Sequence, residues 1–204
     1  ATEFVPSFYN LIVNKAGGTL SSRIWTVTND FELMLGSFAP NDGSSFFNVK
    51  ITDGTFTAPS GNINVLGNWT RNGGIFVHGI GKVTFNNASA DQSINGSQNA
   101  QDFYNLTLIK GSKKLNFSGS ISLVAVRNVL TMNSGNIDLG MTGVLELGAS
   151  PSSAGTLNYT SGTVINGTSG GFKRWIAGSS EPGIDFPVGT SLNTYKARII
   201  FNNN

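Results

Sequence analysis

The single histidine, His78, and the acidic residues are the side chains that could do acid–base or nucleophilic chemistry. One histidine is enough for a serine hydrolase triad, but nothing in this sequence resembles the sharp turn that carries such a serine. His78 ends the alternating run Ile75-Phe76-Val77-His78, so we expect a surface or turn histidine. Zinc sites usually draw on several Cys or His ligands, and Cys is absent, so no zinc centre is expected.

The carboxylates are the second set of candidates, because glycoside hydrolysis uses a pair of them. Two carboxylates could meet across neighbouring turns of a repetitive fold without being close in sequence. Most aspartates, however, stand in turn contexts such as Asp42-Gly43 and Asp53-Gly54. The sequence also has no calcium-binding nonapeptide repeat and no phosphate-binding loop. The scattered aspartates are Asp30, Asp42, Asp53, Asp91, Asp102, Asp138 and Asp185. We therefore expect that the chain is not an enzyme and that it binds no metal and no cofactor.

Aromatic side chains could offer flat faces on which a sugar ring stacks. The chain has 3 Trp and 4 Tyr, and most of them are expected in the core or at the ends of coils. Trp69 stands next to Arg71 and Asn72, and Trp175 stands beside Lys173 and Arg174, so we expect these two at the surface. Trp69 and Trp175 are therefore the predicted ligand-binding candidates.

The elements that would position these residues are predicted to be strands. Side chains alternate between apolar and polar in runs of five to seven residues, such as 114–118, 143–147 and 155–159. These runs are separated by Asn-Gly, Asp-Gly, Ser-Gly and Gly-Gly pairs, which make tight corners. The predicted class is all-β.

A repeated pattern distinguishes between the possible all-β folds. The pattern aromatic-aromatic-Asn-aliphatic begins at Phe8, Phe46 and Phe103, and a second recurrent segment begins at Val27, Val65 and Val126. The offsets between the two segments are 19, 19 and 23 residues. A unit of about 20 residues has the length of one coil of a parallel β-solenoid (β-helix). A β-sandwich is the alternative, but a sandwich does not require such a repeat.

Stacked coils have further consequences for this sequence. Inward Phe, Val, Leu and Ile would form a continuous apolar column, and inward Asn at the corners could form a hydrogen-bonded ladder. Residues 1–204 are predicted to be one solenoid segment of a longer repetitive protein. Residues 77–102 interrupt the spacing and are predicted to be an inserted coil or a lateral excursion. Residues 171–204 are predicted to cap the solenoid or to begin the next repeat.

The overall composition narrows the classes of partner. Only 12% of the residues are charged, while 39% are hydrophobic, which argues for stacked strands with polar turns and against disorder. The net charge is +2 and no basic run is longer than two residues, so nucleic acid is not an expected partner. No apolar run is long enough for a transmembrane helix, and we expect no membrane insertion. Residues 1–4 do not resemble a signal peptide, so any export signal is expected to lie outside this chain or to have been removed.

Six segments form a series along the chain: Gly67-Asn68-Trp69-Thr70, Gly81-Lys82-Val83-Thr84-Phe85, Gln92-Ser93-Ile94-Asn95-Gly96, 103–108, 129–137 and Phe186-Pro187-Val188-Gly189-Thr190. Taken in order, these segments resemble repeat regions of large surface and adhesin-like proteins of Bacteroidetes-type bacteria. The similarity is closest over residues 60–201, and these proteins are often exported by type IX secretion. The resemblance implies an extracellular, repetitive β architecture with an adhesive or structural role, and no catalytic residues.

Two functions remain open from the sequence. The first is a structural or adhesive extracellular module, a rigid rod at the cell surface that stacks on flanking repeats of the same chain or assembles with itself. The second is a carbohydrate-binding or lyase-like β-helix that recognises a polysaccharide or a cell-surface glycan. The second function requires an exposed strip in which Trp or Tyr lies beside Asn and Asp.

Overall fold

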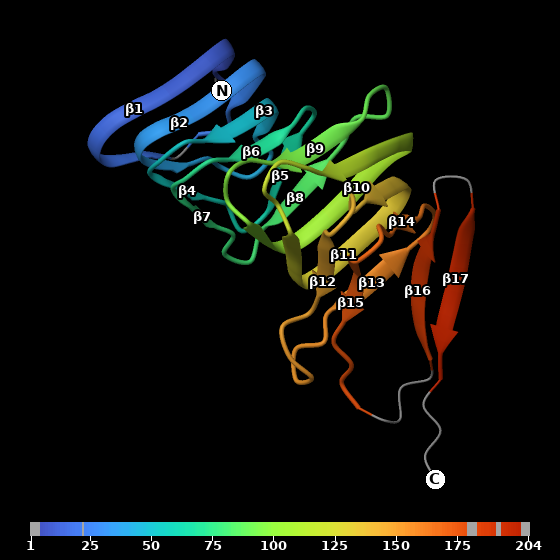
Figure 1. Cartoon of the computed structure of the whole chain (residues 1–204). Coiled ribbons are helices and arrows are strands. Elements are labelled where there is room, and N and C mark those ends of the chain that lie inside the picture. Colours follow the sequence, from blue (N-terminus) through green and yellow to red (C-terminus); the bar gives the residue numbers. More distant parts are fainter. Residues whose placement is uncertain (1–4, 22, 179–182, 191–192, 201–204) are drawn as a thin grey trace.

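Strands and turns, with no helix, make up the described part of the chain, residues 5–21, 23–178, 183–190 and 193–200 of the computed structural model (Figure 1). The strands are β1 (Ser7–Ser21), β2 (Thr26–Ala39), β3 (Ser45–Ile51), β4 (Thr55–Thr57), β5 (Asn62–Val65), β6 (Trp69–Arg71), β7 (Ile75–Val77), β8 (Lys82–Phe85), β9 (Gln92–Asn95), β10 (Ala100–Phe117), β11 (Leu123–Asp138), β12 (Val144–Leu147), β13 (Thr156–Tyr159), β14 (Val164–Ile165), β15 (Gly171–Arg174), β16 (Ile184–Gly189) and β17 (Thr194–Ile199).

The strands stack in parallel, coil upon coil, as a β-solenoid of about 8 turns with about 21 residues in each. In the first turns, residues 19 apart are partners, for example Ser7 with Thr26 and Thr26 with Ser45. Later turns are longer, and Ala100 pairs with Leu123. The predicted all-β solenoid is confirmed. The sandwich alternative is wrong, because sandwiches are built from antiparallel sheets.

The sequence repeat corresponds to neighbouring coils. Each residue that begins an aromatic-aromatic-Asn-aliphatic segment pairs with the valine that begins the next recurrent segment. Like residues therefore lie above one another, as the repeat predicts. The three pairs are Phe8 with Val27, Phe46 with Val65, and Phe103 with Val126.

Long strands bend around the corners of the coil. The ladders of β1 with β2 and of β10 with β11 each contain shifts in register, which are bulges that turn the strand onto the next face. Gly135 lies in β11 with φ of 90°, and a Cβ there would come within 2.7 Å of the Lys113 carbonyl oxygen. Gly36 of β2 has φ of 91°, and a Cβ there would come even closer to the Lys15 carbonyl oxygen of the preceding coil. Glycine is needed at both corners, because a side chain would meet both strain and backbone.

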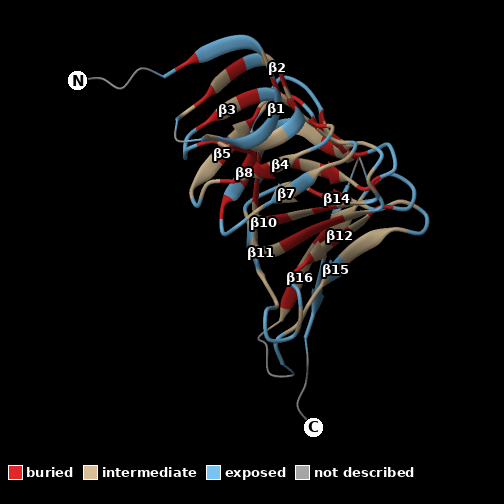
Figure 2. Ribbon diagram, turned by 90° about the vertical axis from the view of Figure 1, so that its left-hand side faces the viewer, coloured by how far each residue is buried: buried red, intermediate tan, exposed pale blue. Residues whose placement is uncertain are grey.

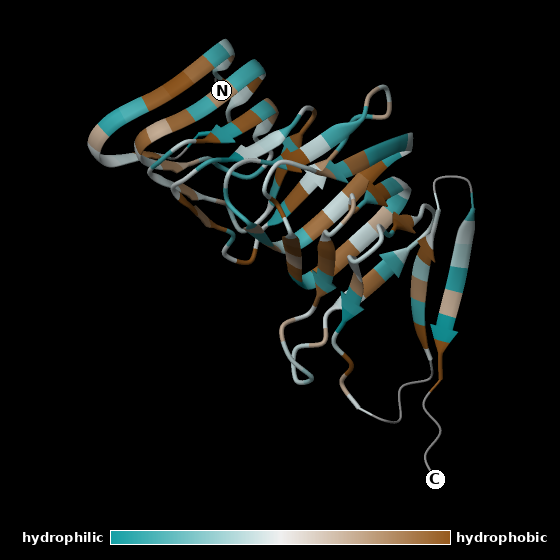
Figure 3. Cartoon of the chain, viewed as in Figure 1, coloured by the Kyte–Doolittle hydropathy of each residue, from teal (hydrophilic) through white to brown (hydrophobic). Residues whose placement is uncertain are grey.

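One hydrophobic core runs along the interior of the stack, from Val13 to Val164. Buried positions alternate with exposed ones along the strands (Figure 2), and the apolar bands follow one another from coil to coil (Figure 3). The first half of this core is aromatic, with ring centroids 4.6 to 6.1 Å apart between Phe31, Phe38, Phe46 and Phe56. The second half is aliphatic and includes Leu130, Met132, Ile137, Leu145 and Leu147.

Asparagine and aspartate side chains link the coils at the corners. The Asn10 Oδ1 atom accepts from the Asp30 backbone N–H at 3.1 Å, and the Asn48 Oδ1 atom accepts from the Asn68 N–H at 2.8 Å. The Asn48 amide also donates to Asp30 Oδ1 at 2.9 Å, and Asn68 Oδ1 accepts from the Ser93 N–H at 2.8 Å. The predicted ladder therefore exists. Its members lie at exposed or half-buried corners, not inside the core.

Residues 77–102 continue the stack. β8 pairs with β5 on one side and β10 on the other, and β9 lies likewise between β6 and β10. The segment therefore adds a coil, with a longer loop between β8 and β9, and does not leave the solenoid as a lateral excursion.

The segment 171–204 starts as a further coil and then changes direction. β15 pairs in parallel with β12, and β16 pairs in parallel with β14. β17 then pairs antiparallel with β16, which interrupts the parallel stacking at this end (Figure 1). Residues 179–182, 191–192 and 201–204 of this segment lie outside the described residues. Within the described part of the chain there is no helix with the length and apolar character to cross a membrane.

Candidate functional site

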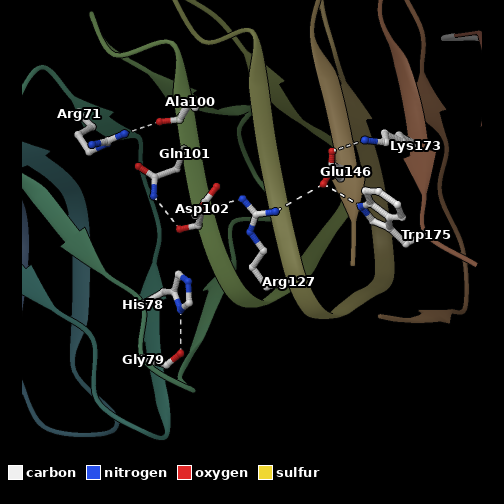
Figure 4. A network of polar contacts seen from close by, with 10 residues as sticks. All are labelled: Arg71, His78, Gly79, Ala100, Gln101, Asp102, Arg127, Glu146, Lys173 and Trp175. Atoms are coloured by element: carbon white, nitrogen blue, oxygen red, sulfur yellow. Dashed lines mark hydrogen bonds and ion pairs between the residues drawn. The ribbon is translucent and has the colours of Figure 1, made fainter. Parts of the chain in front are cut away.

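A row of alternating charges crosses four neighbouring strands of the later coils (Figure 4). Arg127 of β11 lies 2.8 Å from Asp102 Oδ2 of β10 and 3.5 Å from Glu146 Oε1 of β12. Lys173 of β15 lies 2.9 Å from Glu146 Oε2. The charges alternate as −, +, −, + from coil to coil, which supports coil stacking through ion pairs.

Strand register brings these residues together. Asp102 pairs with Ala125, Ala125 pairs with Glu146, and Glu146 pairs with Lys173. Arg127 lies two residues after Ala125 on β11 and reaches the carboxylates on both sides. Residues 19 to 27 apart in the sequence thus become neighbours, because one turn of the solenoid separates them.

Glu146 is the most enclosed carboxylate of this row, with 13% of its side chain exposed. Burial raises the pKa of Glu146, but hydrogen bonds from Trp175 and Lys173, together with the charges of Lys173 and Arg127, lower it below its ordinary value. A general acid in glycoside hydrolysis needs a raised pKa. Glu146 therefore stays ionised, and the arrangement suits an ion pair better than proton donation.

Trp175 lies beside this row and is half-buried. Its indole Nε1 donates to Glu146 Oε1 at 3.0 Å, and the Lys173 ammonium lies 4.7 Å from its ring centroid (Figure 4). The sequence analysis predicted Trp175 to be a ligand-binding residue. The structure places it next to charged groups, with its N–H and one cation–π contact already used within the protein.

Trp69, the other nominated residue, lies in the core and has no exposed surface. Its ring packs edge-on against Phe56, Phe76 and Phe103, and its Nε1 donates to Gln101 Oε1 at 3.1 Å. The expectation of a surface position was wrong. Trp69 is the first residue of β6, a three-residue strand, which is too short for alternation to indicate its face.

Two aspartates cap their own turns, as expected, and others link neighbouring coils. Asp53 Oδ1 accepts from the Gly54 N–H at 2.7 Å, and Asp138 Oδ1 accepts from the Gly140 N–H at 3.1 Å. Asp91 Oδ1 accepts from the Lys114 N–H of the next coil at 2.8 Å. Among the described residues, no group of three or more His, Cys, Asp or Glu side chains could hold a metal ion.

Tyr104 of β10 and His78, just after β7, form a stacked pair near the charged row. Their ring centroids are 5.9 Å apart with an angle of 25° between the planes. The His78 Nδ1 atom lies 2.7 Å from the Gly79 carbonyl oxygen, which holds the imidazole in place (Figure 4). Both side chains are half-buried. Next to Tyr104 is a hollow of about 400 Å³, lined also by Arg127, Asn128, Ala149, Ser152, Ser153 and Gly155.

Arg71 of β6 connects neighbouring coils on the side of Asp102 that faces away from Arg127. Its guanidinium donates to the carbonyl oxygen of Ala100, and at 3.4 Å to that of Gly74 (Figure 4). Burial lowers the pKa of Arg71, and the nearby charge of Asp102 opposes this effect. The residues around it line a second hollow of about 230 Å³ between β7 and the start of β10.

Lys110 is a buried lysine that sequence reasoning missed. Its Nζ atom donates to the carbonyl oxygens of Asn87 and Ala90, both at 3.1 Å, and to Gln92 Oε1 at 2.7 Å. Gln92 is itself buried. Burial lowers the pKa of Lys110 to about 8, and the charge of Asp91 acts in the opposite direction. Three oxygen acceptors match the three donors of an ammonium group, so Lys110 fastens the long loop between β8 and β9.

Comparison of this chain with protein-family models, curated protein sequences and solved structures found no match. The geometry of the molecule and the resemblance stated from the sequence are therefore the grounds for a function.

The sequence carried a partial signal for the residues that it missed. Asp102, Arg127 and Glu146 are separated by 25 and 19 residues, which is close to one coil. Opposite charges at the spacing of one coil predict a row of ion pairs across neighbouring coils. Tyr104 belongs to the repeated aromatic pattern, and its neighbour Phe103 is buried, so alternation already predicts that Tyr104 faces outward.

Proposed function

We propose that this chain is a non-enzymatic structural module of an extracellular or cell-surface protein, whose role is to hold a stiff, elongated shape. The observation that carries the proposal is the single apolar core that passes through the stack from Val13 to Val164. No coil can bury its inner face alone, so each coil is stable only with its neighbours. Such an arrangement resists bending, as a spacer or display rod must.

The polar side chains support the same role. The charged row and the corner ladder use Asp, Asn, Arg and Lys side chains to connect successive coils. Glu146, the most enclosed acid of the row, is held ionised between Arg127 and Lys173. The resemblance to repeats of Bacteroidetes-type surface proteins supports an extracellular location, and low charge with an absence of cysteine is compatible with it.

The first coil supports an adhesive or assembling role. β1 pairs with β2 alone among the described strands, so no described strand covers its outer edge. Tyr9 and Ile12 of β1 are 70% and 61% exposed. A strand of the same repeat type would continue the ladder and partly cover these side chains. We propose that a neighbouring repeat stacks on β1. When this chain is isolated, we expect a second copy of the chain to stack there instead.

Small-angle scattering and activity assays test the structural role together. We expect the scattering to show an elongated particle. We expect the activity assays to show no release of reducing ends or unsaturated uronic products from a panel of polysaccharides. Turnover of any polysaccharide, lost on Glu146→Gln or Asp102→Asn, would overturn the proposal. A compact or strongly flexible particle in solution would overturn it equally.

Sedimentation across a concentration series tests the open edge. We expect the unchanged chain to associate as its concentration rises, and the double variant Tyr9→Lys/Ile12→Lys to stay monomeric, because charges on an exposed edge prevent strand pairing. A matched control is Met141→Lys, which adds a charge at another exposed apolar residue, 72% exposed, away from β1. Equal association of the double variant and the unchanged chain would contradict the role of β1.

A further inference from the structure

The hollow beside Tyr104 lies where the chain leaves the stack between β12 and β13. One wall is formed by Tyr104 of β10 and by Arg127 and Asn128 of β11. The other wall belongs to the loop of residues 148–155. Its volume of about 400 Å³ falls in the range of small-molecule sites, which is roughly 300–1,000 Å³.

The loop wall is held in shape by its own hydrogen bonds. The Ala149 N–H donates to the Ser153 carbonyl oxygen at 2.8 Å, and the Ser153 N–H donates to the Ser150 carbonyl oxygen at 3.0 Å. The hydroxyls of Ser150 and Ser152 lie 2.9 Å apart. These hydrogen bonds fix the conformation of the loop, so the hollow is already formed and binding of a ligand would not have to pay for ordering of the loop.

The Tyr104 ring supplies a fixed aromatic surface at this hollow. The stacked imidazole of His78 supports it, and strand β10 fixes its backbone. An aromatic ring next to polar groups suits a ligand that is apolar on one face and hydroxylated at its edges. A pyranose ring has this character, because its axial C–H groups lie on a face and its hydroxyls point outward.

The polar groups of the hollow can both donate and accept. Within the described part of the chain, the hydroxyls of Tyr104 and Ser153 and the Oδ1 atom of Asn128 have no hydrogen-bond partner. The Asn128 amide nitrogen donates to Asn105 Oδ1 at 2.9 Å, so the orientation of the Asn128 side chain is fixed. Sugar hydroxyls need both kinds of partner, and these three groups provide them.

The charges at the hollow cancel. Arg127 is paired with Asp102 and Glu146, and Glu146 is also paired with Lys173, so the row has two positive and two negative members. A site that bound a uronate or a sulfated sugar would need an unneutralised cation. We infer that the hollow formed by Tyr104, Arg127, Asn128 and the 148–155 loop binds a neutral saccharide. This inference does not depend on the rod role, because either could hold without the other.

Titration calorimetry with defined oligosaccharides tests the inference. The probes are neutral gluco-, manno-, xylo- and galacto-oligosaccharides, with oligogalacturonate and oligoalginate as the charged set. We expect a neutral probe to bind, and Tyr104→Ala to weaken it by about tenfold or more, since buried aromatic anchors dominate such sites. Tyr195→Ala is the matched control, because Tyr195 of β17 is 61% exposed and does not line the hollow, and this variant should bind like the unchanged chain.

A second variant keeps the test decisive if Tyr104→Ala does not fold. Ser153→Trp adds bulk to an exposed turn and should block the hollow with an unchanged melting temperature. Three results would overturn the inference: no binding of any neutral probe at millimolar concentration, preferred binding of the charged set, or binding of a neutral probe that neither variant weakens. Scattering data would be the same in all three cases, so the rod proposal is judged separately.

Discussion

Lys110 Nζ donates to Gln92 Oε1 at 2.7 Å, and both side chains are buried between neighbouring coils. The Gln92 amide in turn donates to the carbonyl oxygen of Val65 at 2.9 Å. The pair thus connects β10 to β9 and to the end of β5. A buried ammonium group is stable here because backbone and side-chain oxygens replace the water that it lost.

This environment predicts a distinctive pH dependence of stability. The pKa of Lys110 is lowered from 10.5 to about 8 in the folded chain, so between these values the unfolded chain binds the extra proton. The free energy of unfolding should therefore rise from about pH 8 to about pH 10.5, by roughly 3 kcal/mol at most. Denaturant unfolding at a series of pH values measures this rise.

Lys110→Met should abolish that rise, because the variant has no group to titrate at this position. The difference between the two curves is the relevant quantity, because it isolates the contribution of Lys110. Lys82→Met, which removes an exposed lysine, should keep the rise. A curve for Lys110→Met that parallels the unchanged chain would show that Lys110 does not cause it.

Trp69→Ala should be among the most destabilising single changes in the chain. The side chain is fully buried against three aromatic rings, and large-to-small core substitutions of this kind cost about 3–5 kcal/mol. Trp175→Ala, at a half-buried surface position, should cost about 1 kcal/mol. Thermal and denaturant unfolding of the two variants compares them directly. A smaller loss in Trp69→Ala than in Trp175→Ala would contradict the core position.

Asn48→Ala should loosen three coils at one corner. Asn48 accepts from the Asn68 N–H and donates to Asp30, so the variant loses both connections at a cost of about 1–2 kcal/mol. Hydrogen exchange of the Asn68 amide should be faster in the variant, because its acceptor is gone. Asn158→Ala is the matched control; Asn158 is exposed on β13 and its side chain has no hydrogen bond to other described residues. Unchanged exchange at Asn68 would remove the case for the ladder.

Glu146→Gln should make the chain less sensitive to acid. The folded pKa of Glu146 lies below its ordinary value of 4.5, so its ionised form stabilises the fold above that pH. This stabilisation is lost as the pH falls from about 4.5 through the folded pKa. The variant should be less stable at neutral pH by about 1 kcal/mol, since its partners are partly exposed, and should lose less on acidification.

Unfolding of both proteins between neutral and acidic pH measures this difference. Asp53→Asn is a suitable control, because Asp53 is exposed in a turn and pairs with the N–H of Gly54. If the unchanged chain and Glu146→Gln lose stability in parallel, Glu146 does not contribute to the acid response.

The sequence alone determined the class of fold, the approximate length of the coil and the identity of neighbouring residues. Phe46 lies beside Val65 because a period of 19 residues places one above the other. Alternation in long strands also predicted which residues are buried, since successive side chains point to opposite faces. These are local or periodic properties, and a single sequence displays them directly.

Only the tertiary structure decided the rest. Trp69 stands in a strand of three residues, where alternation is too short to fix a face, and its neighbours in space determine that it is buried. Lys110 is buried because the long loop between β8 and β9 places carbonyl oxygens around it. Tyr104, Asn128 and Ser153 line one hollow because three coils and a loop meet there. Such meetings depend on loop lengths and on packing between coils, which the repeat does not specify.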